Sequence, residues 1–180
     1  MRPFTLIMAI LSIGGLLFGC AAIERTMPST LSDANIVSVL NTIDVTEIDA
    51  AQLAKEKASS LPVQAYAMHL LEDHTVMMQK DLELVSRMKV QPHKPRLASA
   101  LESTHQETME ELRKMSREDF DRAYIAYQVT MHQQALKLVE DTADSADDVR
   151  LQYHLGQARP DLQSHLAMAQ DLQRQLVAQQ

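Results

Sequence analysis

The chain has 180 residues, which corresponds to about one domain with a sizeable hydrophobic core. Its formal net charge of −7 and the lack of a basic cluster argue against nucleic-acid binding and against electrostatic attachment to anionic lipid headgroups. Four glycines, 4% aromatic residues and an abundance of Ala, Leu, Met, Gln, Glu and Lys favour helices, and no alternating run indicates a strand. We therefore predict an all-α protein.

Residues 1–19 have the pattern of a signal peptide. Arg2 supplies the positive start, and the apolar run that ends at Phe18 is shorter than the roughly 20 residues that a membrane-spanning helix needs. The segment LFGC, which ends at Cys20, resembles the lipobox of bacterial lipoproteins. This resemblance implies cleavage before Cys20 and attachment of lipid to it. The alternative is an ordinary cleaved signal peptide followed by an incidental cysteine.

The same resemblance implies a location in the cell. Ala22 stands where an aspartate would imply retention in the inner membrane, so we expect an outer-membrane lipoprotein that faces the periplasm. Residues 20–32 would form a lipidated tether, and residues 33–178 one helical domain. Because Cys20 is the chain's only cysteine, no intrachain disulfide can form. The membrane, reached through the lipid, is the one partner that the sequence predicts, and it identifies no protein partner.

Apolar residues at three- and four-residue steps predict five helices in the domain. They run from Ser32 or Asp33 to about Ser60, from Leu61 to Lys89, from Leu97 to Met115, from Arg117 to Ala143, and from Asp147 to Gln175. Ser116 with Asp119 resembles a capping box at the start of the fourth helix, and Pro160 should kink the last one. The short connection between the first two helices predicts that they are antiparallel neighbours. Four long helices and one short helix indicate a four-helix bundle with an extra helix.

Each long helix carries a polar residue on its apolar stripe, namely Glu47, His74, His132 and His165. Asp161 precedes His165 by one turn and Asp81 follows His74 by two turns, so we expect both to face inward as well. Imidazole and carboxylate side chains that converge from facing helices are how metal sites in bundles are built. We therefore consider a transition-metal site for Fe, Zn or Cu, with Glu47, His74, His132, Asp161 and His165 as its ligands.

The alternative is a structural polar network, in which the same side chains hydrogen-bond across helices and fix their register without a ligand. Asp81 and Gln128 would belong to it. Known di-iron bundles use two Glu-x-x-His pairs, whereas this chain has one such pair, Glu102 with His105, on the short helix. Both interpretations stay open at this point.

Other chemistry is less well supported by the sequence. Eleven methionines suit Cu(I), but most lie at helical core spacing, where methionine is a common filler. We expect His69, His93 and His154 to be solvated. The chain has no nucleophile elbow and no Gly-rich phosphate loop, which sets aside phosphoryl transfer and dinucleotide chemistry.

Three segments carry a combined signature of Asp-His-Thr, Phe-Asp-x-x-Tyr and Pro-x-Leu-x-x-His-Leu. They are EIDAAQLAKEKASSLPVQAYAMHLLEDHT, FDRAYIAYQVTMHQQALKLVE and RPDLQSHLAMAQDL. Together they resemble a bacterial family of predicted outer-membrane proteins, domain-of-unknown-function family 4142, over about Asn35 to Leu176. The resemblance implies a ferritin-like helical bundle and brings no activity with it. It places Glu47, Asp73, His74, Phe120, Asp121, Tyr124, His132, Pro160 and His165 at the family's characteristic positions, whose histidines are suspected of binding metal.

These observations combine into one prediction of fold and several of function. We predict a ferritin-like up-and-down four-helix bundle with one short extra helix, with Asp73, Asp81, Asp121, Tyr124 and Gln128 in a structural polar core. Because no catalytic group is assembled, we expect a non-enzymatic role by binding, as in envelope stress. The alternative is a metal-storage protein or metal-dependent oxidoreductase. A third hypothesis is a structural lipoprotein whose acidic surface docks a partner.

Overall fold

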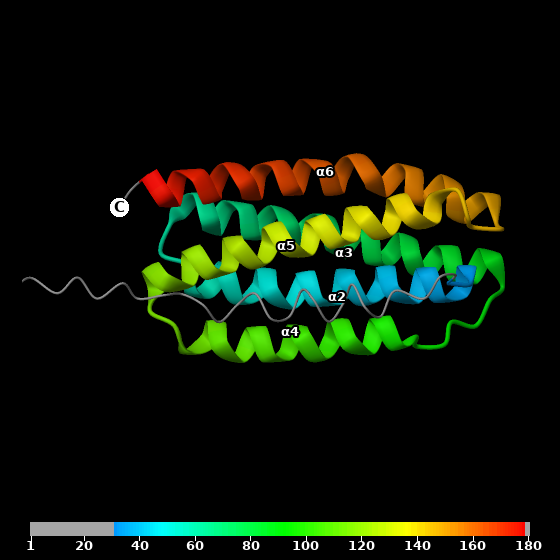
Figure 1. Cartoon of the computed structure of the whole chain (residues 1–180), viewed down its shortest axis with the longest axis horizontal. Helices are drawn as coiled ribbons and strands as arrows, with labels where there is room; N and C mark the ends of the chain where they lie inside the picture. Colours follow the sequence, from blue (N-terminus) through cyan, green and yellow to red (C-terminus); the bar gives the residue numbers. More distant parts are fainter. Residues whose placement is uncertain (1–30, 179–180) are drawn as a thin grey trace, which may run out of the picture.

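The computed structural model describes residues 31–178, which form five helices and no strands within that range. The helices are α2 (Asp33–Lys57), α3 (Leu61–Met88), α4 (Arg96–Lys114), α5 (Arg117–Ala143) and α6 (Val149–Ala178) (Figure 1). All five predicted helices are confirmed, with ends close to those expected. The predicted signal peptide, Cys20 and most of the tether lie outside the described residues.

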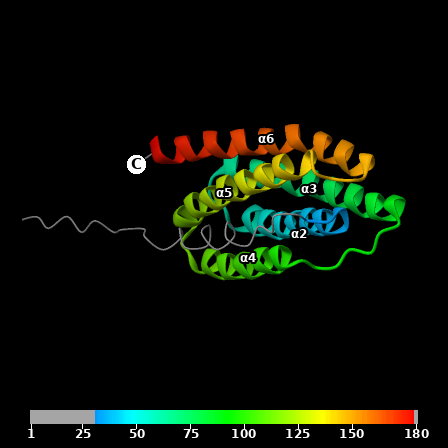
Figure 2. The same ribbon diagram turned by 45° about the vertical axis from the view of Figure 1, so that its right-hand side comes forward.

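Four of the helices form a bundle, and the fifth packs on its side. Successive helices run in opposite directions, and α2 with α3 and α5 with α6 are the most extensively packed pairs (Figure 1). The short α4 lies along α2 and α5, on the side of the molecule away from α6 (Figure 2). Because α4 returns the chain, α3 and α5 run in the same direction. The four-helix bundle with one short extra helix is therefore confirmed, as is the antiparallel α2–α3 pair.

The apolar core is divided into two clusters along the bundle axis. One cluster contains Ile43, Leu84, Met131 and Leu162, and the other contains Ala50, Leu70, Ile125 and Ala169. Near the junction of the two clusters every long helix carries buried polar residues: Asp44 and Glu47 on α2, His74 on α3, Gln128 and His132 on α5, and His165 on α6. A polar layer therefore crosses the middle of the bundle.

The helix ends are fixed by side chains as well as by backbone turns. The Ser116 hydroxyl accepts a hydrogen bond from the backbone N–H of Asp119 at 3.3 Å, which confirms the predicted cap of α5. At the α2–α3 turn, the buried Asp121 carboxylate accepts from the backbone N–H groups of Ser59 at 3.0 Å and Ser60 at 2.8 Å. Helix α6 continues through Pro160 without interruption. None of the helices in the described range is long and apolar enough to span a membrane.

Replacing Asp121 by alanine should destabilise the bundle, because the turn would lose three charge-assisted hydrogen bonds, including one from the Ser59 hydroxyl. We expect the free energy of unfolding to fall by about 2–3 kcal/mol in urea titrations followed by circular dichroism. Asp161→Ala, at an exposed position, is the matched control and should change stability by less than about 0.5 kcal/mol. Equal stability of the two variants would contradict this role of Asp121.

Candidate metal centre

Three histidines from three helices meet in the polar layer. His74 on α3, His132 on α5 and His165 on α6 are each at most 1% exposed. Their ring centroids are 5.2 to 5.6 Å apart. One ring nitrogen of each histidine lies within 4.8 Å of a ring nitrogen of each of the others. We call this group of His74, His132 and His165 the inner site.

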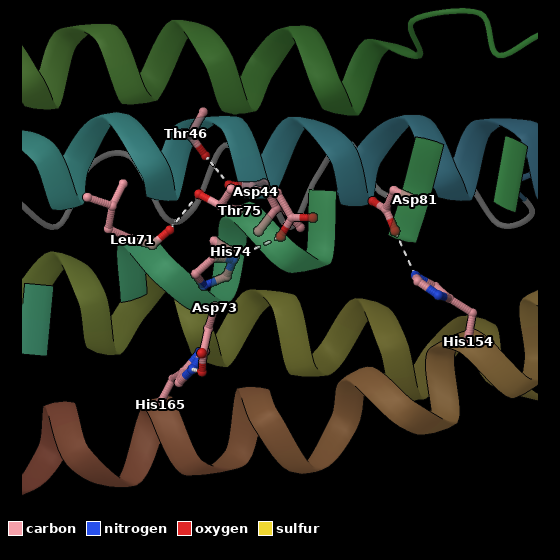
Figure 3. Close-up of polar contacts among 10 residues, drawn as sticks. Asp44, Thr46, Leu71, Asp73, His74, Thr75, Asp81, His154 and His165 are labelled. Carbon is pink, nitrogen blue, oxygen red and sulfur yellow. Dashed lines mark hydrogen bonds and ion pairs between the residues drawn. The ribbon is translucent and has the colours of Figure 1, made fainter. Parts of the chain in front are cut away.

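One nitrogen of each ring is held by an acceptor outside the inner site. His74 Nδ1 is 2.8 Å from Asp44 Oδ1, and His165 Nε2 is 3.0 Å from Asp73 Oδ2 (Figure 3). His132 Nδ1 donates to the backbone carbonyl of Gln128 at 3.0 Å. With these nitrogens as donors, the lone pair of each neutral ring is on the other nitrogen.

The opposite nitrogens of the three rings have no hydrogen-bond partner within the described residues. They are Nε2 of His74, Nε2 of His132 and Nδ1 of His165. Buried polar atoms are usually paired, because leaving one unpaired costs about 1–3 kcal/mol. Three such atoms on three neighbouring rings therefore require an explanation.

Burial keeps the three imidazoles neutral. It lowers the pKa of His165 to about 4, and it lowers the pKa of His74 and, further, that of His132. His74 and His165 lower the pKa of His132 as well, and His74 also lowers that of His165, since a second positive charge would be repelled. At neutral pH all three rings are therefore in the form that binds a metal ion.

Two carboxyl groups of the polar layer are unusually hard to ionise. Burial and the neighbouring charge of Asp81 raise the pKa of Asp44 well above its ordinary value, and burial raises that of Asp81 as well. A proton held by this pair reduces the cost of burying two carboxylates, and Asp44 Oδ1 can still accept from His74. The pair therefore supports His74 without adding two full charges to the core.

Glu47 is the third buried carboxyl group and lies on α2. Burial raises its pKa to about 6, whereas the charge of His74 acts in the opposite direction. The Gln128 side chain, on α5, lies beside Glu47 and also favours its charged form, and the buried Tyr124 hydroxyl lies next to the same amide. Glu47 is not one of the residues that supply the closely spaced ligand atoms of the inner site, although it lies one helical turn from Asp44, which contacts His74.

The predicted ligands are therefore only partly brought together. His74, His132 and His165 converge, and Glu47 is buried close to them. The expectation that Asp161 faces inward is wrong, because its side chain is exposed. Its buried neighbours on α6, Leu162 and Ala169, both lie to one side of His165 around the helix. Asp161 lies about 40° around the helix in the other direction.

The predicted structural polar residues have separate roles. Asp73 and Gln128 hold two rings of the inner site, and Asp121 fixes the α2–α3 turn. Asp81 accepts from His154 Nε2 at 2.6 Å (Figure 3). The expectation that His154 is solvated is therefore wrong, since its side chain is 16% exposed and paired.

The single Glu-x-x-His pair does not form part of the inner site. Glu102 pairs with Lys94 on the surface. The ring of His105 bridges the hydroxyl of Tyr127 at 3.0 Å and the carboxylate of Asp49 at 2.9 Å. This histidine therefore attaches α4 to α5 and α2.

Sequence reasoning missed Asp44, the acceptor that orients His74. A signal for it was present, because Leu40, Asp44, Glu47 and Ala51 follow one another at four- and three-residue steps. All four are buried on α2. The same periodicity that identified Glu47 therefore also places Asp44 inside.

Fold and site together define a helical bundle whose polar middle layer contains a buried cluster of three histidines. The chain matches the family described as Domain of unknown function (DUF4142) over residues 19–172, a range that includes every residue of the inner site, and it belongs to that family. The comparisons with curated proteins and with solved structures found no match.

Glu47→Gln should stabilise the metal-free protein at neutral pH. The folded-state pKa is raised from 4.5 to about 6, so the Glu47 contribution to stability is fully present below pH 4.5 and is lost as the pH rises through 6. A shift of this size corresponds to about 2 kcal/mol. We therefore expect the variant to be more stable by about that amount at pH 7.5 and nearly equal to wild type at pH 4.5. A variant less stable than wild type at pH 7.5 would show that the ionised carboxylate is favourably paired.

Proposed function

We propose that this protein binds a transition-metal ion at the inner site, between Nε2 of His74, Nε2 of His132 and Nδ1 of His165. One observation supports the proposal above all others. Three buried, neutral imidazoles from three helices meet with ring nitrogens within 4.8 Å of one another, and each ring has one unpaired nitrogen while its other nitrogen is held by Asp44, Asp73 or the Gln128 carbonyl. Metal-binding histidines are supported in this way by a carboxylate or a backbone carbonyl on the far nitrogen.

A purely structural network explains the polar layer less well. Such a network stabilises a fold when all of its members are satisfied, and a partly satisfied network is worse than an apolar core. The three ring nitrogens have no partner in the described part of the chain. A cation bound to the three lone pairs would satisfy the rings, and the Glu47 carboxylate would partly neutralise its charge.

The donor set favours Zn²⁺, copper or iron, all of which imidazole suits. Around a tetrahedral Zn²⁺ the ligand nitrogens would be about 3.4 Å apart, so ring nitrogens that now lie within 4.8 Å of one another need only small movements to close on the ion. Three histidines leave a fourth position open, for which Glu47 is our candidate ligand. We propose metal binding or storage as the role.

We propose further that the bundle is ferritin-like and is held in the outer membrane by lipid at Cys20, facing the periplasm. The helix order supports the first part. In the sequence α4 stands between the pairs α2–α3 and α5–α6, and on the side of the bundle it carries the chain back along the bundle, as a long crossover does in ferritin-like folds. The second part is supported by the LFGC segment at the end of the apolar run. The protein would then bind metal ions in the cell envelope and contribute in this way to stress tolerance.

Metal titration of the purified protein, prepared without a His tag, tests the inner site. We expect one Zn²⁺ or Co²⁺ per chain. His132→Leu, which removes a ligand and keeps an apolar volume, should lower the affinity by about 100-fold or more without loss of stability. Asp44→Ala should lower it by about 10–100-fold, because the His74 ring loses its acceptor.

The matched control is His93→Ala, since His93 is an exposed histidine on the α3–α4 connection. It should bind metal as tightly as wild type. If His132→Leu binds metal as tightly as the control, the inner site is not the metal site.

The lipid anchor is tested by Cys20→Ser in a bacterial host that processes lipoproteins. We expect the wild-type protein to fractionate with outer membranes and the variant to be lost from them, because the thiol that would carry the lipid is gone. A metabolic label of lipid on the wild-type chain is the positive control. Retention of the variant in the membrane fraction would contradict the anchor.

A further inference from the structure

His165 belongs to two groups of potential ligands. Its Nδ1 is buried without a hydrogen-bond partner in the described residues, and its Nε2 is bonded to Asp73. A second set of closely spaced ligand atoms, all within 4.8 Å of one another, comes from His69, Asp73 and His165. We call this set the outer site.

Two residues of the outer site are partly exposed to solvent, and the third, His165, belongs to the inner site as well. His69 and Asp73 are one turn apart on α3, with His69 Nε2 3.5 Å from Asp73 Oδ2, and their side chains are 45% and 36% exposed. The rings of His69 and His165 meet edge to face with centroids 5.4 Å apart. His165, on α6, is buried, and Figure 3 shows it reaching Asp73 across the gap between the two helices. An imidazole and a carboxylate are thus open to water beside a ring that also faces the interior.

We propose that the outer site captures a divalent transition-metal ion from solvent and that His165 passes this ion to the inner site. The inference rests on the proposed function, because it concerns how the inner site is loaded. The three inner rings are fully buried, so an ion needs a route that exchanges its water ligands stepwise for protein ligands. His69, Asp73 and His165 Nε2 offer two imidazoles and a carboxylate at the surface end of that route.

The transfer is balanced in ligands and protons. A neutral imidazole has one lone pair in its plane, so His165 serves the outer site through Nε2 or the inner site through Nδ1, but not both. When the ion moves inward, Nδ1 releases its proton to solvent and Nε2 takes one up. The Nε2–H group then donates to Asp73, which is the hydrogen bond that the structure shows. The two sites are therefore alternatives, and the chain should hold one ion.

A simpler role for Asp73 makes a different prediction. If Asp73 only orients His165, then His69 has no part in metal binding, since its side chain is 45% exposed and its 3.5 Å approach to Asp73 is a weak contact. Removal of His69 separates the two possibilities. Because this residue is exposed, its replacement leaves the core of the bundle intact.

Stopped-flow loading of the metal-free protein with Co²⁺, followed by the absorption of the bound ion, provides the test. His69→Ala should slow loading at low Co²⁺ by about tenfold and should slow release to a chelator by a similar factor, because the path of uptake is also the path of release. His93→Ala, the control for loss of an exposed imidazole, should load and release at the wild-type rates.

Three outcomes would overturn the proposal. They are wild-type loading and release rates in His69→Ala, a loss of affinity in this variant without slower loading, and two ions bound together in one chain. In each of these cases metal binding at the inner site is still supported if His132→Leu no longer binds the ion. If instead His132→Leu binds Co²⁺ like wild type, the proposed function itself fails.

Discussion

The polar layer in the middle of the bundle is the constraint on which the rest of the structure depends. Apolar residues fill both ends of the core, whereas the four long helices place carboxyl, amide and imidazole groups between them. Replacing buried polar and ionic groups by well-packed apolar residues is often neutral or stabilising, so a polar layer of this size is not needed for folding as such. Its unpaired ring nitrogens are better explained by a ligand than by the stability of the bundle.

The supporting residues determine how precisely the three rings are placed. Asp44 and Asp73 lie on α2 and α3 and hold rings from α3 and α6, so each hydrogen bond also links two helices. Asp121 of α5 holds the turn between α2 and α3 and thereby fixes the register of those helices against α5. The site is thus carried by rigid helices rather than by loops, which favours a reproducible geometry.

The sequence predicted the helices well because an apolar stripe repeats at every turn, and the same stripe brought His74, His132 and His165 inward. It failed for Asp161, since one turn along a helix still leaves about 40° of rotation, enough to move a side chain from the core to its edge. It also failed for His154, which stands beside the stripe of α6 but finds Asp81 on α3. Pairs such as these depend on the rotation and register of two helices, which the periodicity of each helix alone does not fix. The outer site is of the same kind, because His69 and Asp73 come close to His165 only once α3 and α6 are packed.

Anomalous diffraction from crystals grown with Zn²⁺ tests the central claim most directly. We predict one peak in the polar layer, bonded to Nε2 of His74, Nε2 of His132 and Nδ1 of His165 at about 2.0–2.1 Å. Peaks confined to exposed histidines such as His93, with the three inner rings placed as they are now, would contradict it.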